Sequence, residues 1–211
     1  MLLDSTRPLG ETSNTKSGRP KIITAGDPRL YHESTHVQAQ TYWFALRATY
    51  SRELKVQSLL KEKGLSTFVP MIRRKYEKDG LHTNKLVPAI GNLCFVRWTK
   101  EALDTFIRSF GEDSPVTYYW NRISNSPLII PDKAMEDFMT VASTMDEDLI
   151  YVTQISPKLR EGKTVKVKHG PFKGVEGKIV RIRKSRRILV ELPGMLAVAS
   201  TYVGLENLEL L

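Results

Sequence analysis

The residues best suited to chemistry are His32, Glu33 and His36, which lie in the stretch HESTH. Two histidines four positions apart, with a glutamate next to the first, match the HExxH pattern of zinc metalloproteases, in which one helix directs both imidazoles at a metal. The surroundings do not favour a helix here, because Pro28 lies just upstream and Ser34 is a poor helix former. We therefore interpret the motif as a chance match.

No other set of residues supports catalysis. The later histidines, His82 and His169, do not lie near a carboxylate pattern that would complete a zinc site. Cys94 lies within the apolar run NLCFV, where a buried small hydrophobe is expected rather than a nucleophile. The sequence has no phosphate-binding loop of the GxxxxGK(S/T) type and no serine-elbow motif. We expect a protein that is not an enzyme and needs neither a metal nor a cofactor.

The composition indicates a globular protein. The chain has 211 residues, of which 41% are hydrophobic, enough for one ordinary domain or two small ones. No apolar run approaches the roughly 20 residues that span a membrane. The N-terminal stretch MLLDSTRPLGETSNTK lacks the charged start and apolar core of a signal peptide. The single cysteine allows no internal disulfide, which fits a reducing compartment, so we expect a cytoplasmic protein.

The positive charge is concentrated near the C-terminus. The net charge is +9, and residues 151–211 carry 12 basic and 5 acidic side chains, whereas residues 41–150 carry 15 and 14. A localised basic surface is the usual mark of a phosphate-rich or acidic partner. A merely soluble basic domain is the alternative reading of the same charge.

The first ordered element is predicted to begin at Thr41. Residues 1–40 are rich in Ser, Thr, Gly and Pro without a sustained hydrophobic period, which predicts a flexible N-terminal extension. Aromatic and β-branched residues then predict a buried strand over 41–49. The leucine spacing that follows predicts an amphipathic helix, with Ser51 as its N-cap and Gly64 as its end.

The next segments continue this alternation of strands and helices. They are a hairpin turning at Asp79-Gly80, a buried strand over 92–98, a helix over 100–111, a strand and an extended segment over 114–130, and a helix that starts at Pro131 and Asp132. This order predicts an α+β fold, with helices packed on an antiparallel sheet near the ferredoxin-like (RRM-like) split βαβ plan. We expect this domain to span residues 41–146.

The last part of the chain has a different pattern. An acidic cluster and a polar stretch with Pro157 and Gly162 predict a linker over 147–162. Residues 163–211 alternate apolar and polar side chains over five short runs broken by Gly and Pro, which predicts a small β-barrel because closure removes exposed strand edges. Three glycines in GPFKGVEGKI, namely Gly170, Gly174 and Gly177, predict a loop that needs positive φ or close backbone approach.

Several of these stretches resemble one protein family. GPFKGVEGKI resembles the KOW motif of SH3-like barrels, with Gly170, Pro171, Phe172, Gly174 and Gly177 as its motif residues. WFALRATYSRE, FVPM, VPAIGNLCFV and SPLIIPDKAMEDF resemble the NGN domain of the NusG family of transcription elongation factors. The resemblance covers about residues 41–211. PAIGNLCFV, GPFKGVEG and AVASTYV are most similar to the UpxY-type specialised NusG paralogues, which antiterminate surface-polysaccharide operons.

The resemblance implies a function and a partner. Family members bind the clamp region of RNA polymerase through an apolar depression on the NGN sheet and suppress pausing or termination. Such a site needs aromatic anchors that become buried on binding. The candidates by motif position are Trp43, Phe44, Pro70, Phe95 and Trp98. Because side chains alternate along a strand, only about half of them can face outward, so each is either an anchor or a core residue.

Basic residues form three candidate nucleic-acid contacts, for non-template DNA or for nascent or leader RNA. They are Arg47, Arg52 and Lys55 around the first helix, Arg73, Arg74 and Lys75 in the hairpin, and Arg181, Arg183, Lys184, Arg186 and Arg187 in the barrel. Each group is alternatively a solvated surface.

Other inferences concern the barrel and the assembly. Phe172 either meets a protein partner or plugs the barrel. The stretch LPGMLAV lacks the aromatic residue with which general NusG proteins couple to a ribosomal protein, so ribosome coupling is in doubt. The alternative function is a KOW-containing RNA-binding or ribosome-binding module that never engages polymerase. A monomer without membrane contact is expected.

Overall fold

The computed structural model describes residues 39–78, 80–121 and 123–211, and residues 39–211 form one compact unit. The HESTH motif and nearly all of the expected N-terminal extension lie outside the described residues. None of the helices in the described ranges is long and apolar enough to cross a membrane.

An antiparallel sheet forms the centre of the N-terminal half. Its strand order is β2-β5-β1-β6, and β9 also pairs with β1. The strands are β1 (Tyr42–Ala48), β2 (Thr67–Phe68), β5 (Leu93–Trp98), β6 (Val116–Tyr118) and β9 (Ile129–Ile130). The predicted strands over 41–49 and 92–98 are therefore confirmed. Consecutive residues of β1 and β5 are fully buried, which is the pattern of a strand covered on both faces.

Three helices cover the two faces of this sheet. They are α1 (Glu53–Glu62), α2 (Lys100–Arg108) and α3 (Asp132–Ala142), and all three were predicted. Helices α1 and α2 pack on the face that carries Phe44 and Leu46, and α3 packs on the face that carries Trp43 and Phe95. Ser51 is not the N-cap of α1, because that position belongs to Arg52. Ser51 instead lies in the 3-10 turn η2 (Thr49–Ser51).

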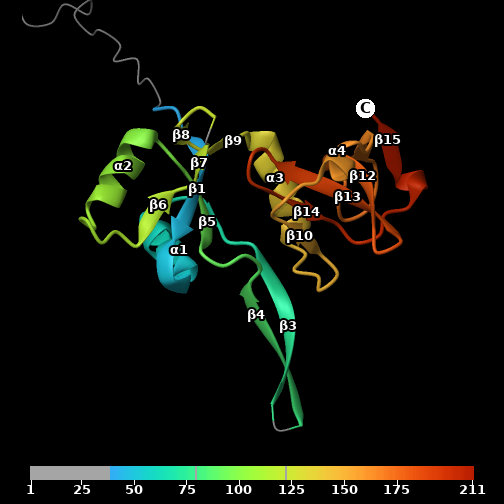
Figure 1. Cartoon of the computed structure of the whole chain (residues 1–211), viewed down its shortest axis with the longest axis horizontal. Helices are drawn as coiled ribbons and strands as arrows, with labels where there is room; N and C mark the ends of the chain where they lie inside the picture. Colours follow the sequence, from blue (N-terminus) through green and yellow to red (C-terminus); the bar gives the residue numbers. More distant parts are fainter. Residues whose placement is uncertain (1–38, 79, 122) are drawn as a thin grey trace, which may run out of the picture. The chain divides into compact units, whose positions relative to one another are not determined.

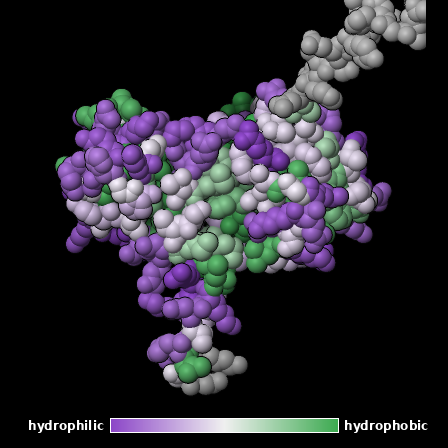
Figure 2. Space-filling model, turned by 180° about the vertical axis from the view of Figure 1, so that it is seen from behind, coloured by the Kyte–Doolittle hydropathy of each residue, from purple (hydrophilic) through white to green (hydrophobic). Residues whose placement is uncertain are grey.

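A long hairpin projects from this sheet domain (Figure 1). Strands β3 (Met71–Lys78) and β4 (Leu81–Pro88) pair along their whole length, from Met71 with Pro88 to Lys78 with Leu81. The predicted hairpin is thus confirmed. Gly80, on the described side of the turn, has φ +75°, a conformation that glycine adopts without steric cost. Figure 2 shows the hairpin as a mostly hydrophilic projection.

The C-terminal half is a second, β-rich domain with one continuous six-stranded sheet. Its order is β10-β14-β13-β12-β11-β15. The strands are β10 (Ile150–Val152), β11 (Thr164–Val167), β12 (Glu176–Ile182), β13 (Ser185–Leu192), β14 (Leu196–Ala199) and β15 (Leu208–Leu210). A short helix, α4 (Pro157–Arg160), follows β10, and a 3-10 turn, η3 (Leu205–Asn207), precedes β15. A small separate hairpin pairs β7 (Trp120–Asn121) with β8 (Ser126–Pro127).

The segment predicted as a linker is more structured than expected. Strand β10 lies inside the 147–162 range and pairs with β14 through Ile150–Ala199 and Val152–Ala197. It is therefore part of the C-terminal sheet. The α+β architecture of a helix-covered sheet and a second β-rich domain is as predicted.

Helix α3 packs against both sheets. Phe138 lies 5.8 Å from Phe95, between ring centroids, and 6.3 Å from Tyr151 of β10. One hydrophobic cluster contains residues of β1, α3, β13 and β14. At the helix surface, Lys133 Nζ donates to both carboxylate oxygens of the buried Asp137 and, at 3.0 Å, to the carbonyl of Gly174. Helix α3 is therefore a shared element of the two domains.

The glycines of the KOW-like loop meet the predicted requirements. Gly170 and Gly174 both have φ +88°. At Gly177 a Cβ atom would lie 2.6 Å from the carbonyl oxygen of Leu189, so only glycine fits beside β13. Phe172 is buried in the cluster shared with α3, which assigns it to the core of this domain.

Candidate nucleic-acid and protein interfaces

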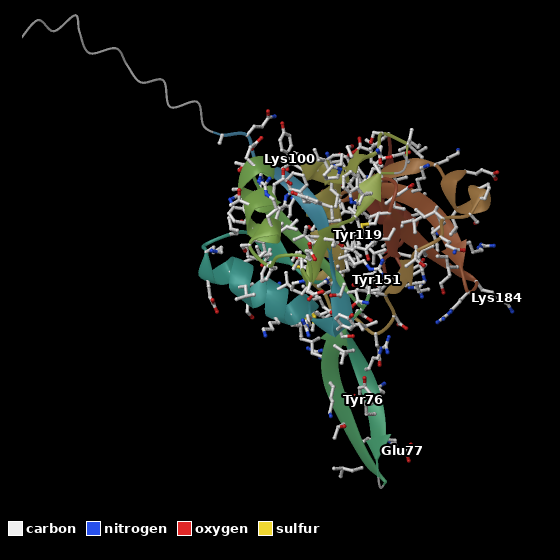
Figure 3. All side chains as sticks on the ribbon, turned by 60° about the vertical axis from the view of Figure 1, so that its left-hand side comes forward. Tyr76, Glu77, Lys100, Tyr119, Tyr151 and Lys184 are labelled. Atoms are coloured by element: carbon white, nitrogen blue, oxygen red, sulfur yellow. The ribbon has the colours of Figure 1, made fainter. Side chains whose placement is uncertain are left out.

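The hairpin has two chemically different faces, because side chains alternate along each strand. Arg74 and Lys85 are directly opposite each other on one face, and among the described residues neither has a carboxylate partner. The next pair on that face is Tyr76 with Thr83, and the Lys85 ammonium lies 5.7 Å from the centre of the Tyr76 ring. Tyr76 is visible on the projecting hairpin in Figure 3. This face offers cations and an aromatic ring.

On the other face of the hairpin, the positive charges lie beside acidic side chains of the loop after α3. Lys75 donates a 2.9 Å hydrogen bond to Glu147, in the loop after α3. Arg73 and Lys75 line a hollow of about 330 Å³ together with Asp146 and Glu147. The three predicted residues Arg73, Arg74 and Lys75 are thus divided between two faces. Only Arg74 lies on the face of Lys85 and Tyr76, where the cations have no acidic partner among the described residues.

The turn between β1 and α1 carries a second exposed aromatic and cationic group. Tyr50 has φ +57° and is 84% exposed, and the Arg52 guanidinium lies 5.4 Å from its ring centre. Ser51, also at positive φ, donates its N–H to the Asn92 side chain at 2.8 Å, which fixes the turn. Lys55 lines the same shallow pocket as Arg52.

Arg47 belongs to a different surface from Arg52 and Lys55. It lines a groove of about 840 Å³ with Tyr119, Trp120, Ile123 and other residues. Burial raises the pKa of Tyr119, and the nearby Arg47 charge opposes that rise. The groove therefore combines an arginine with aromatic and aliphatic side chains.

The five predicted polymerase anchors lie in or against the core. Trp43 and Phe95 are covered by α3, and Phe44 is covered by α1 and α2. Pro70 is buried, and Trp98 is half-buried, with its ring 6.0 Å from that of Phe106 on α2. Of the two roles left open for each residue, burial favours core packing, because helices cover both faces of this sheet. Contact with polymerase through these five side chains remains a prediction.

Two of the exposed apolar side chains instead lie in the groove of Arg47, which residues of the edge strand β6 also line. Trp120 is 55% exposed and Ile123 is 98% exposed, and both line the groove of Arg47. Large apolar side chains so exposed are typical of interaction surfaces when they are contiguous. The five anchors named from the sequence do not include Trp120. The signal that favoured exposure was its position next to the polar turn NRISNS.

The basic cluster of the C-terminal domain lies at the β12–β13 hairpin. Arg181, Arg183 and Lys184 are exposed and Arg186 is half-buried, and Lys184 points away from the domain in Figure 3. Arg187 is a correction to the predicted set, because it is buried. Its Nη1 donates to the carbonyls of Asp148 and Ser200 at 2.7 and 2.8 Å, so its role is structural.

The comparisons with known proteins concern the first domain most directly. The family model "NusG: Transcription termination factor nusG" matches residues 41–139. This part of the chain is therefore similar to the NusG family. Among solved structures, NusG of Thermotoga maritima, described for its domain interaction, is similar at 17% identity and a TM-score of 0.40, over 81% of this chain and 97% of that one. No curated protein matches the chain.

The domain that matches this family has no catalytic constellation among its described residues. Cys94 is buried in β5, and burial, reinforced by the charge of Glu53, raises the pKa of its thiol to about 12. Within the described ranges no group of His, Cys, Asp and Glu side chains could hold a metal ion.

Proposed function

We propose that the chain is a transcription factor that binds RNA polymerase and suppresses pausing or termination. The observation that carries the proposal is the match of residues 41–139 to the NusG family model, which includes the sheet, the hairpin and most of α3. The finer proposal is antitermination of surface-polysaccharide operons. It is supported by the similarity of PAIGNLCFV and AVASTYV to UpxY-type paralogues.

Polymerase docking, in this proposal, uses the groove of Arg47 and Trp120. Trp and Arg are the residue types that most often dominate binding energy when an interface buries them. Ile123 adds an almost fully exposed apolar side chain. The clamp region of polymerase is the proposed partner surface.

Nucleic-acid contact, in this proposal, uses cations that form no ion pair among the described residues. Arg74 and Lys85 on the hairpin, and Arg52 and Lys55 at the start of α1, are placed for phosphates of the exposed non-template strand. Tyr76 and Tyr50 lie beside these cations and offer rings on which bases can stack.

The test is retention of core RNA polymerase from the native host on the immobilised full chain. Trp120→Ala is compared with Tyr202→Ala, which removes a ring of similar exposure from the C-terminal domain. We expect retention by wild type and by Tyr202→Ala, and a loss of about tenfold for folded Trp120→Ala. Circular dichroism establishes that each variant is folded. A termination assay with the retained polymerase then measures antitermination.

The second candidate function is an RNA-binding or ribosome-binding module without polymerase affinity. The observation that favours it is the 12 basic against 5 acidic residues of segment 151–211. If wild type fails to retain polymerase at low salt, with any recruiting signal supplied, but binds RNA, this candidate replaces the first.

A further inference from the structure

The loop that follows α3 lies against one face of the β3–β4 hairpin. Its residues 146–148 are Asp-Glu-Asp, and we call them the acidic loop. Lys75 of β3 donates a 2.9 Å hydrogen bond to a carboxylate oxygen of Glu147. Arg73 and Lys75 line the hollow of about 330 Å³ together with Asp146 and Glu147. An acidic segment therefore faces two of the cations of the hairpin.

The backbone of the acidic loop is held by contacts of its own. The Asp148 N–H donates to the Asp146 side chain at 2.8 Å, and the Leu149 N–H donates to the Asp146 carbonyl at 3.2 Å. Met145, just before the loop, has φ +51°, a conformation that residues with a side chain rarely adopt. Leu149, just after it, is buried in the core. These features fix the position of the loop, and with it of its carboxylates, beside the hairpin.

The loop backbone is firmly held, whereas the ion pair that it makes with the hairpin is exposed. Arg187 of β13 is buried and donates to the Asp148 carbonyl at 2.7 Å, which holds the loop from the other side. The side chains of Lys75 and Glu147 keep 69% and 55% of their surfaces accessible. An exposed ion pair contributes little to stability, so another anion can replace the Glu147 carboxylate at small cost.

The two faces of the hairpin therefore differ in what a phosphate group meets. On the face of Arg74 and Lys85, no carboxylate pairs with the cations among the described residues. On the face of Arg73 and Lys75, a phosphate approaches the negative charges of the acidic loop, and like charges repel. It can reach the Lys75 ammonium there only by replacing Glu147.

We propose that the acidic loop masks one face of the hairpin from nucleic acid, with the Glu147 carboxylate in the place where a phosphate would bind Lys75. Masking rests on the nucleic-acid contact of the proposed function and decides which face makes that contact. Phosphate contacts fix the orientation of a nucleic acid on a protein. With one face masked, the strand has a single path along the hairpin, past Arg74 and Lys85. Glu147 is thus a positioning residue that acts through Lys75.

The experiment measures binding of a fluorescent oligothymidylate single strand to the full chain, by anisotropy at several salt concentrations. Glu147→Gln removes the masking carboxylate. The matched control Glu209→Gln removes the same charge at an exposed side chain of β15 that has no ion pair among the described residues. We expect the affinity at low salt to rise at least about threefold for Glu147→Gln and less than about twofold for the control. The slope of the logarithm of affinity against that of salt concentration should steepen by about 0.7 for Glu147→Gln alone, as for one added phosphate contact.

A double-mutant cycle with Lys75→Gln shows whether the gain comes through Lys75. In the wild-type background, Lys75→Gln should change the affinity by less than about twofold, because Glu147 already occupies this ammonium. In the Glu147→Gln background, it should cancel the gain in both affinity and slope. The proposal is overturned if Lys75→Gln has the same effect in both backgrounds, or if Glu147→Gln and Glu209→Gln act equally.

Failure of the proposed nucleic-acid contact has a different signature. That contact fails if the wild-type chain binds no DNA. Masking is still supported in that case if Glu147→Gln binds DNA and Lys75→Gln abolishes this binding, and it is overturned if neither wild type nor Glu147→Gln binds. Circular dichroism and the urea midpoint establish that every variant is folded.

Discussion

Arg74 and Lys85 face each other across the β3–β4 hairpin without a carboxylate partner among the described residues. Like charges directly opposite on a sheet are destabilising, by about 0.2–1 kcal/mol relative to neutral pairs. Such a pair is retained at a cost to the folded hairpin, and binding of a phosphate would offset it.

The substitution Lys85→Glu should change stability and DNA affinity in opposite directions. The free energy of unfolding should rise by up to about 1 kcal/mol, because Arg74 gains an opposite charge. Affinity for single-stranded DNA should fall, and the slope of its logarithm against the logarithm of salt concentration should become shallower by at least about 0.7. Urea unfolding and fluorescence anisotropy at several salt concentrations measure the two effects.

The control for that variant is Arg73→Ala, which removes a cation from the other face of the same hairpin, beside the acidic side chains of the loop after α3. Its salt dependence should stay close to that of wild type. Equal losses of DNA affinity in both variants would show that the hairpin does not bind through one face.

Arg187→Ala should destabilise the C-terminal domain without affecting nucleic-acid binding. The buried guanidinium donates to the carbonyls of Asp148 and Ser200, and its removal leaves both acceptors unpaired. We expect a loss of about 3 kcal/mol in the free energy of unfolding, measured by urea denaturation. Arg186→Ala is the neighbouring comparison and should change stability by about 0.5 kcal/mol or less. An unaltered midpoint for Arg187→Ala would contradict the structural role.

Gly177→Ala should destabilise the same domain by steric overlap. The added Cβ would lie 2.6 Å from Leu189 O and 2.7 Å from Ile188 Cγ2, so the β12–β13 pair has to separate. The expected cost is about 1–3 kcal/mol. Gly91→Ala is the control, because its Cβ would meet nothing within 4 Å and its φ lies outside the left-handed region. A thermal melt that moves equally for both variants would refute the argument.

Cys94 should be unreactive in the native protein. Burial raises its thiol pKa to about 12, so a thiol reagent at pH 8 should modify it only after urea is added. Because the pKa is higher in the folded than in the unfolded state, this thiol contributes stability that is fully present below its ordinary pKa of 9.0. That contribution is lost as the pH rises through about 12. Cys94→Ser should lack this component of the loss of stability at alkaline pH. Urea unfolding at several pH values would detect the difference.

Much of the fold could be predicted from the sequence. The strand over 92–98 and the helix over 100–111 carry strong hydrophobic periodicity, and the structure has β5 and α2 there. Strand β10 was missed because its three residues, Ile150–Val152, follow an acidic cluster and are ordered by pairing with the distant β14. Local pattern contains no signal for such a contact.

The candidate site was predicted less well, for two reasons. Alternation assigns Trp43 and Phe44 to opposite faces of β1, but it cannot show that helices cover both faces. Arg187 has the same charge as its neighbours, and its burial follows from its position opposite Val180, beside two carbonyls that it satisfies. The division of Arg73, Arg74 and Lys75 between two faces could have been found from alternation alone.

Because α3 contributes to one hydrophobic cluster with β1 on one side and with β13 and β14 on the other, the two domains share part of their core. Neither can lose its structure without exposing Phe138 and Met135 to water. Residues 41–211 should therefore melt in a single cooperative transition. A fragment that ends before β10 should be less soluble than the intact chain, since it leaves one side of α3 uncovered.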